Sequence, residues 1–129
     1  MAKATSVGIE GVAQVITARH HRMTADEPLS EGGTDTGPAP YEILMAALCA
    51  CSSATLRLYA ARKGWELGRI EVRCVFARDE AGGESIRRFV SIGAPQGEDQ
   101  RARLADIIEK TPVTRTLKRA MAIATTFDW

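Results

Sequence analysis

The sequence predicts an α+β fold in which residues 1–129 form a single domain. Three patterns lead to this prediction: an uncharged run typical of a buried helix, an apolar alternation typical of a strand, and apolar residues at helical spacing late in the chain. In chain order, the expected elements are strands, a helix, strands, a helix and a strand. A chain of this length can bury one hydrophobic core, with little material to spare.

The N-terminal region is expected to form strands. Residues 7–17 mix β-branched side chains with glycine, and residues 18–26 follow without a strong helix signal. β-Branched residues are typical of strands. We therefore expect a curled N-terminal hairpin or meander.

A long central helix is expected from Pro40 to about Lys63. No charged side chain occurs between Glu42 and Arg57, and strong helix formers dominate this run. Proline suits the first turn of a helix because its missing N–H would be unpaired there. Gly64 is well placed to end the helix.

The same helix is apolar on nearly all sides, so it must be surrounded by protein. A transmembrane helix needs about 20 consecutive apolar residues. Ser52, Ser53 and Arg57 interrupt the run too early, so no membrane contact is expected. Surrounding such a helix is hard for a lone chain of this size, and we therefore expect a homodimer with the helix at its centre.

Residues 70–93 are expected to form a β-hairpin. Apolar residues alternate with others along its first strand, and the buried positions would be Ile70, Val72, Cys74 and Phe76. Gly82-Gly83 is a turn signal, and apolar residues return after it.

The last third of the chain should contain a helix over residues 98–109, where apolar residues follow helical spacing. Thr111-Pro112 should end that helix or kink it into another. Residues 121–127 are rich in β-branched side chains, and we expect them to form a closing strand.

Composition excludes several classes of protein. A formal charge of +1 signals neither a nucleic-acid partner nor a polybasic membrane contact. Residues 1–7 contain no apolar signal core, so a cytoplasmic protein with reduced thiols is expected. No metal or other cofactor is expected, because adjacent His20 and His21 face opposite ways, as do Cys49 and Cys51, so four ligands would not converge.

Several ordered motifs resemble the osmotically inducible protein C (OsmC) and organic hydroperoxide resistance (Ohr) superfamily. They are Ala18-Arg19-His20-His21, Ala25-Asp26-Glu27-Pro28, the loop from Gly32 to Glu42, the helix segment from Ala46 to Ala60, and Glu109 to Leu117. The resemblance covers almost the whole chain. It implies an intertwined homodimer with sites at the subunit interface. It also implies reduction of hydroperoxides by a reactive cysteine on the central helix and a second cysteine that forms a disulfide with it.

Carried over by position, Cys51 matches the peroxide-attacking cysteine of the superfamily. Its thiolate would attack the peroxide and become a sulfenic acid, which a second thiol converts to a disulfide. Thr111 occupies the position of that second cysteine, and a hydroxyl does not form a disulfide. The expected function is therefore reduction of organic hydroperoxides with an external thiol or dithiol as reductant. The alternative is a non-catalytic dimer that binds a hydrophobic ligand or senses peroxide through Cys51.

The other two cysteines are expected to pack rather than react. Two positions along a helix turn a side chain by about 200°, so Cys49 and Cys51 should point to opposite faces. Cys74 lies at a buried position of its strand, and buried free cysteines usually behave as small apolar residues.

A cation near Cys51 is needed to favour its thiolate, because a helix N-terminus about three turns away contributes little. By correspondence with the superfamily, the candidate is Arg19, and Arg22 is its rival. Glu42 is the candidate carboxylate that orients the arginine. It lies nine residues before Cys51, about 180° around a continuous helix, so its alternative role is to stabilise the start of that helix.

Overall fold

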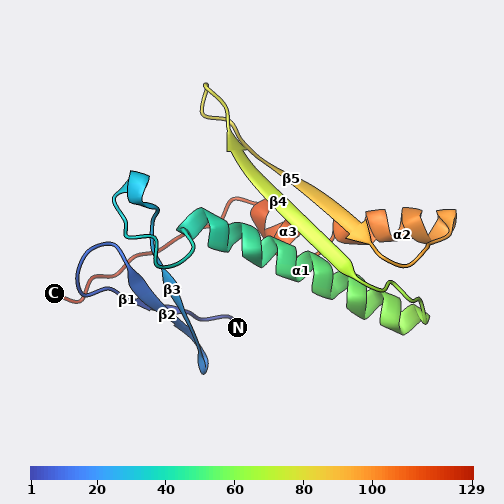
Figure 1. Cartoon of the computed structure of the whole chain (residues 1–129), viewed down its shortest axis with the longest axis horizontal. Helices are drawn as coiled ribbons and strands as arrows, with labels where there is room; N and C mark the ends of the chain where they lie inside the picture. The colour runs from blue at the N-terminus through green and yellow to red at the C-terminus, as the bar shows by residue number, and fades with distance from the viewer. The chain divides into compact units, whose positions relative to one another are not determined.

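The computed structural model describes residues 1–129, and its contacts divide the chain into two compact units, Met1–Ala46 and Ala47–Trp129. Its order of strands and helices is the α+β arrangement expected from the sequence (Figure 1). The central helix α1, Pro40–Lys63, begins in the first unit and continues into the second.

The first unit contains a three-stranded antiparallel meander in the order β1-β2-β3. Its strands are β1 (Thr5–Val7), β2 (Gln14–Ala18) and β3 (His21–Ala25). This confirms the expected N-terminal meander. Arg19 lies in the tight turn between β2 and β3 with a φ of 56°, a left-handed conformation that few non-glycine residues adopt.

The loop after β3 is organised around one buried carboxylate. Asp26 is 1% exposed, and its carboxylate accepts hydrogen bonds of 2.7 Å from the hydroxyls of both Thr34 and Thr36. These bonds, together with the hydrogen bond that the backbone amide of Thr36 donates to the same carboxylate, lower the pKa of Asp26. Gly37 passes so close to the preceding strand that an added Cβ would lie 2.2 Å from the carbonyl oxygen of Thr24. The loop after β3 therefore packs closely against that strand at Gly37. A 3-10 turn, Leu29–Glu31, lies within this loop.

Helix α1 has the bounds expected from the sequence, and Gly64 follows it with a φ of 70°. Its buried residues recur every three or four positions and form one stripe: Met45, Leu48, Ser52, Leu56 and Ala60. Only 28% of the most apolar part of the helix is buried within the chain. The helix is long and apolar enough to cross a membrane by length and composition alone, a test that core helices of soluble proteins also pass. A single chain therefore buries one face of α1, rather than all of it.

The second unit packs a hairpin and two short helices with α1. The hairpin consists of β4 (Ile70–Arg78) and β5 (Glu84–Ile92), and the helices are α2 (Glu98–Ile108) and α3 (Pro112–Leu117). These elements confirm the expected hairpin and the helix after residue 98. Of the two outcomes expected at Thr111-Pro112, the helix ends, at Ile108, and a separate helix begins at Pro112. The core of the unit consists of Leu56, Ala60, Leu67, Leu104 and Ile108.

The expected closing strand over residues 121–127 is wrong for this chain. Residues 120–129 form neither helix nor strand. Strand propensity is realised only where another strand offers its backbone groups, and no strand pairs with this segment.

Candidate functional site

Cys51 lies near the middle of α1, next to the fully buried Ser52. The Cys51 thiol is free and half-buried. The Ser52 hydroxyl donates to the carbonyl oxygen of Leu48, one turn earlier, at 2.7 Å. The buried Ser52 side chain faces the other elements of the second unit. Cys51, the preceding residue, lies about 100° around the helix from Ser52.

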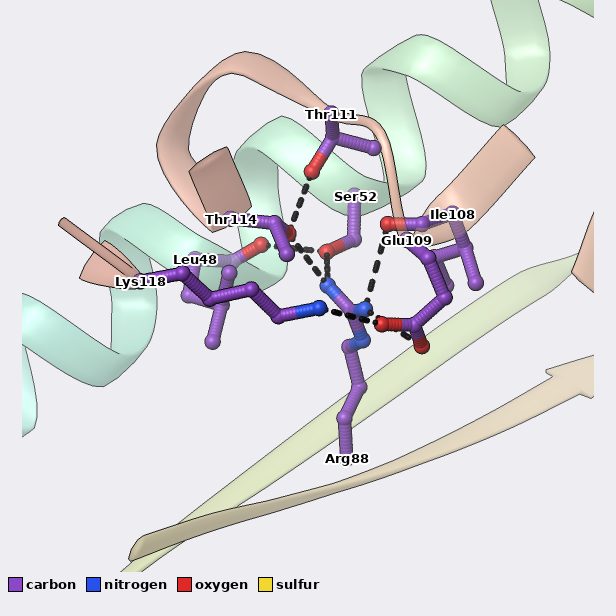
Figure 2. A network of polar contacts seen from close by, with 8 residues as sticks. All are labelled: Leu48, Ser52, Arg88, Ile108, Glu109, Thr111, Thr114 and Lys118. Atoms are coloured by element: carbon purple, nitrogen blue, oxygen red, sulfur yellow. Dashed lines mark hydrogen bonds and ion pairs between the residues drawn. The ribbon is translucent and has the colours of Figure 1, made fainter. Parts of the chain in front are cut away.

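The centre of the polar contacts around Ser52 is Arg88 of β5 (Figure 2). Its side chain is 11% exposed. One guanidinium nitrogen donates to the Ser52 hydroxyl at 2.9 Å and to the Thr114 hydroxyl at 2.8 Å. The other donates to the carbonyl oxygen of Ile108, at the end of α2, at 3.1 Å. Arg88 thus joins α1, β5, α2 and α3 in one network.

Glu109 closes this network on its exposed side. Its carboxylate lies 3.3 Å from the Arg88 guanidinium and 2.9 Å from the ammonium of Lys118. Both cations lower the pKa of Glu109, with the Lys118 hydrogen bond as the largest cause. The positive charge of Arg88 is therefore partly balanced at the edge of the network, while its neutral hydroxyl and carbonyl partners lie inside.

Thr111 is fully buried in this network. Its hydroxyl lies 2.5 Å from that of Thr114, which accepts from Arg88. Thr111 immediately precedes Pro112, the first residue of α3. Thr111 is thus linked through the Thr114 hydroxyl and Arg88 to Ser52, the residue after Cys51.

The other expected site residues lie in the first unit. Arg19 occupies the β2–β3 turn and Arg22 lies on β3, and both are exposed. The Glu42 carboxylate accepts a 2.8 Å hydrogen bond from the backbone N–H of Ala39, at the start of α1. This contact is the helix-stabilising alternative considered for Glu42. Cys51 belongs to the second unit, so the catalytic roles of Arg19 and Glu42 stay predictions.

The remaining thiols, Cys49 and Cys74, are both half-buried. They are neighbours, since Cys49 is one of the groups that shift the pKa of Cys74. Burial, the largest cause, raises the pKa of the Cys74 thiol to about 11, and Cys49 adds to the increase. The rings of His20, in the β2–β3 turn, and His21, the first residue of β3, lie 4.0 Å apart at a tilt of 39°. No group of three potential metal ligands is present.

Sequence reasoning missed Arg88, which makes the most polar contacts in this unit. The signal lay in the strand alternation: Arg88 shares its side of β5 with Ile86 and lies directly opposite Cys74 of β4. A charged residue at an inward position of a strand indicates a buried polar network.

A cavity of about 710 Å³ lies beside this network in the second unit. Most of its lining is apolar, and Arg88 and Arg101 contribute the positive charges. The apolar part is formed mainly by Leu56, Val90, Ile92, Leu104 and Ile108. Its size is typical of cavities that bind small molecules.

The chain matches the OsmC-like protein family over residues 33–126, and it therefore belongs to that family. The match includes the helix with Cys51 and the segment with Thr111. No curated protein is similar enough in sequence to give a match.

Solved structures of the same fold agree with this assignment. The chain is similar to an OsmC-like protein from Mycoplasma pneumoniae, with 22% identity, a TM-score of 0.78, and coverage of 92% of this chain and 87% of that one. It is also similar to the organic hydroperoxide resistance protein OhrB of Bacillus subtilis, with 24% identity, a TM-score of 0.60, and coverage of 92% and 90%. An organic hydroperoxide resistance protein OsmC from Legionella pneumophila gives 16% identity, a TM-score of 0.70, and coverage of 92% and 89%.

Proposed function

We propose that this protein reduces organic hydroperoxides through Cys51, with an external thiol or dithiol as reductant. The observation that carries the proposal is the match to the OsmC-like family across the helix that holds Cys51. Two similar structures are of organic hydroperoxide resistance proteins. A free, half-buried thiol meets the first requirement of this chemistry, which is a cysteine that a small peroxide can reach.

The reaction proceeds in two stages. The Cys51 thiolate attacks the distal oxygen of the hydroperoxide, the O–O bond breaks, and the alkoxide takes a proton and leaves as the alcohol. The Cys51 sulfenic acid then condenses with an external thiol, which releases water and leaves a mixed disulfide. A second external thiol attacks this disulfide and restores the Cys51 thiol. Thr111 takes no part in these steps, because its hydroxyl does not form a disulfide.

The homodimer expected from the sequence is part of the proposal. Its support is the apolar surface that a single chain leaves exposed on α1, which includes Leu44 and Leu58. Exposed apolar surface of this kind is typical of protein interfaces. In such a dimer, we propose Arg19 as the cation that favours the Cys51 thiolate, with Arg22 as the rival. Glu42 would orient that cation only if it exchanged its hydrogen bond with Ala39 for one with the arginine.

Peroxide consumption by the wild type and by Cys51→Ser tests this proposal. We expect multiple turnovers of an aryl hydroperoxide by the wild type with a monothiol or a dithiol, and no turnover by Cys51→Ser when Cys49 and Cys74 are also replaced with alanine. Ser53→Ala, two positions along the same helix, is the matched control and should keep its activity. Wild-type oxidation that stops after one equivalent would refute the catalytic cycle.

Restoring the missing thiol with Thr111→Cys gives a second test. If Cys51 holds the attacking role, its sulfenic acid should be captured as a disulfide between Cys51 and the introduced thiol. Turnover of this variant should then depend more strongly on a dithiol than on a monothiol. Peptide mapping without reductant identifies the bond.

The cavity beside Arg88 favours a second candidate function, which is binding of an apolar ligand that carries an anionic group. Its walls are largely apolar, and Arg88 and Arg101 supply positive charge. A titration with a fluorescent fatty acid tests this candidate, and Arg101→Glu should weaken the binding. An unchanged affinity in Arg101→Glu would count against it.

A further inference from the structure

Cys49 and Cys74 face each other within the second unit. Cys74 lies directly opposite Arg88 in the β4–β5 hairpin, and Arg88 reaches Ser52 on α1. Residues directly opposite in an antiparallel pair project from the same face of the sheet, so Cys74 also projects toward α1. Cys49 precedes Ser52 by three positions, which places both on the same side of the helix.

The two thiols are near enough for Cys49 to raise the pKa of Cys74. Cys51 lies about 200° around α1 from Cys49 and therefore points away from this pair. Cys49 and Cys74 thus form a dithiol that is separate from Cys51.

We propose that Cys49 and Cys74 form a redox-active pair, which closes into an intramolecular disulfide between α1 and β4 when the protein meets a hydroperoxide. The proposal rests on the proposed function in one respect, since it takes the same class of oxidant. It does not need Cys51. A disulfide requires converging Cβ atoms. A helix and a strand that present their cysteines toward each other allow that convergence, whereas Cys49 and Cys51 on one helix do not.

The two thiols have different parts in the reaction. Burial and the contact with Cys49 keep Cys74 protonated at neutral pH, since they raise its pKa to about 11. We assign the attack on the peroxide to Cys49 and the resolving step to Cys74, because a thiol that stays protonated is the poorer nucleophile. The positive charge of Arg88 opposes this rise in pKa only in part, so the Cys74 thiol stays protonated.

The reaction balances as one two-electron oxidation. The Cys49 thiolate attacks the distal peroxide oxygen, the O–O bond breaks, and the alcohol leaves after taking a proton. The Cys74 sulfur then attacks the sulfur of the Cys49 sulfenic acid. The S–O bond breaks, and the hydroxide leaves as water with the proton of Cys74. Two thiols and one hydroperoxide thus give one disulfide, one alcohol and one water.

The full-length Cys51→Ser protein isolates this pair, because it contains no other cysteine. It is treated with one equivalent of cumene hydroperoxide, and the remaining thiols are blocked with N-ethylmaleimide under denaturing conditions. We expect both thiols to be lost together, a mass lower by two hydrogen atoms, and a Cys49–Cys74 cross-linked peptide that a reductant removes. A stable sulfenic acid on Cys49, unreacted thiols, or cross-links only between chains would overturn the proposal.

Two further variants separate this proposal from the function assigned to Cys51. In Cys51→Ser/Cys74→Ala, we expect Cys49 sulfenic acid that dimedone traps and no intramolecular cross-link. Cys49→Ala/Cys74→Ala keeps Cys51 alone and reports only on the proposed catalytic cycle. A cross-link in Cys51→Ser supports the pair even if Cys49→Ala/Cys74→Ala has no turnover. Turnover by that variant without a cross-link in Cys51→Ser overturns the pair alone. Thermal melting of the reduced variants verifies that each is folded.

Discussion

Replacing Arg88 with methionine should destabilise the second unit, because this side chain joins four elements through buried contacts. The Ile108 carbonyl would lose its guanidinium donor, and a buried polar group left unpaired costs about 1–3 kcal/mol. The Ser52 and Thr114 hydroxyls would keep their contacts with Leu48 and Thr111, so each adds only roughly 0.5–1 kcal/mol.

The remaining terms in the Arg88→Met change are small or offsetting. The contact with the exposed Glu109 contributes about 0–1 kcal/mol. Removing a buried charge recovers part of its desolvation cost, and the methionine keeps much of the apolar packing. We therefore expect Arg88→Met to lower the free energy of unfolding by about 2–4 kcal/mol, which corresponds to a fall in Tm of roughly 10 °C.

Urea unfolding at neutral pH measures this loss, with Arg87→Met as the matched control. Arg87 is the preceding residue of β5, and its side chain is exposed. An exposed substitution of this kind should change stability by no more than about 0.5 kcal/mol. If Arg88→Met unfolds within about 1 kcal/mol of Arg87→Met, the Arg88 network does not hold the second unit together.

Two further predictions concern the first unit. Gly37→Ala should destabilise it by at least about 1–3 kcal/mol, because the new Cβ would lie 2.2 Å from the Thr24 carbonyl. In urea unfolding, Gly97→Ala is the control with open space around it, and equal losses in the two variants would contradict this reasoning. The Asp26 carboxyl has a lowered pKa in the fold, so the stability it contributes is present above its unfolded value of about 3.9 and lost as pH falls through its folded pKa. The stability advantage of the wild type over Asp26→Asn should therefore shrink as pH falls below about 4, and a pH-independent difference would contradict this.

The sequence predicts best the elements whose ends are marked by proline or glycine. Proline at position 40 and glycine at position 64 mark both ends of α1, and the structure places the helix between them. The β4–β5 hairpin has a glycine turn and a clear alternation. The segment over residues 121–127 has strand propensity without a turn or a partner, and it forms no strand.

The candidate site was harder to predict because its contacts join positions far apart in the chain. Arg88 contacts residues 36 positions before it and 26 after it, and no local pattern encodes either distance. The contact between Cys49 and Cys74 was missed for the same reason. Each residue alone resembles an ordinary packing cysteine, and only the register of β4 against β5 and the packing on α1 bring them together.

The Thr111 hydroxyl supports the network around Arg88. A cysteine is a weak hydrogen-bonding group, whereas the Thr111 hydroxyl contacts Thr114 at 2.5 Å, and Thr114 accepts from Arg88. A hydroxyl at position 111 thus supports the network that holds Arg88 more strongly than a thiol would. The positive charge of Arg88 also acts on the pKa of the Cys74 thiol. Arg88 therefore connects the contact between Thr111 and Thr114 with the Cys49–Cys74 pair. Arg88→Met should therefore alter the rate of Cys49–Cys74 disulfide formation as well as stability, whereas Arg87→Met should alter neither.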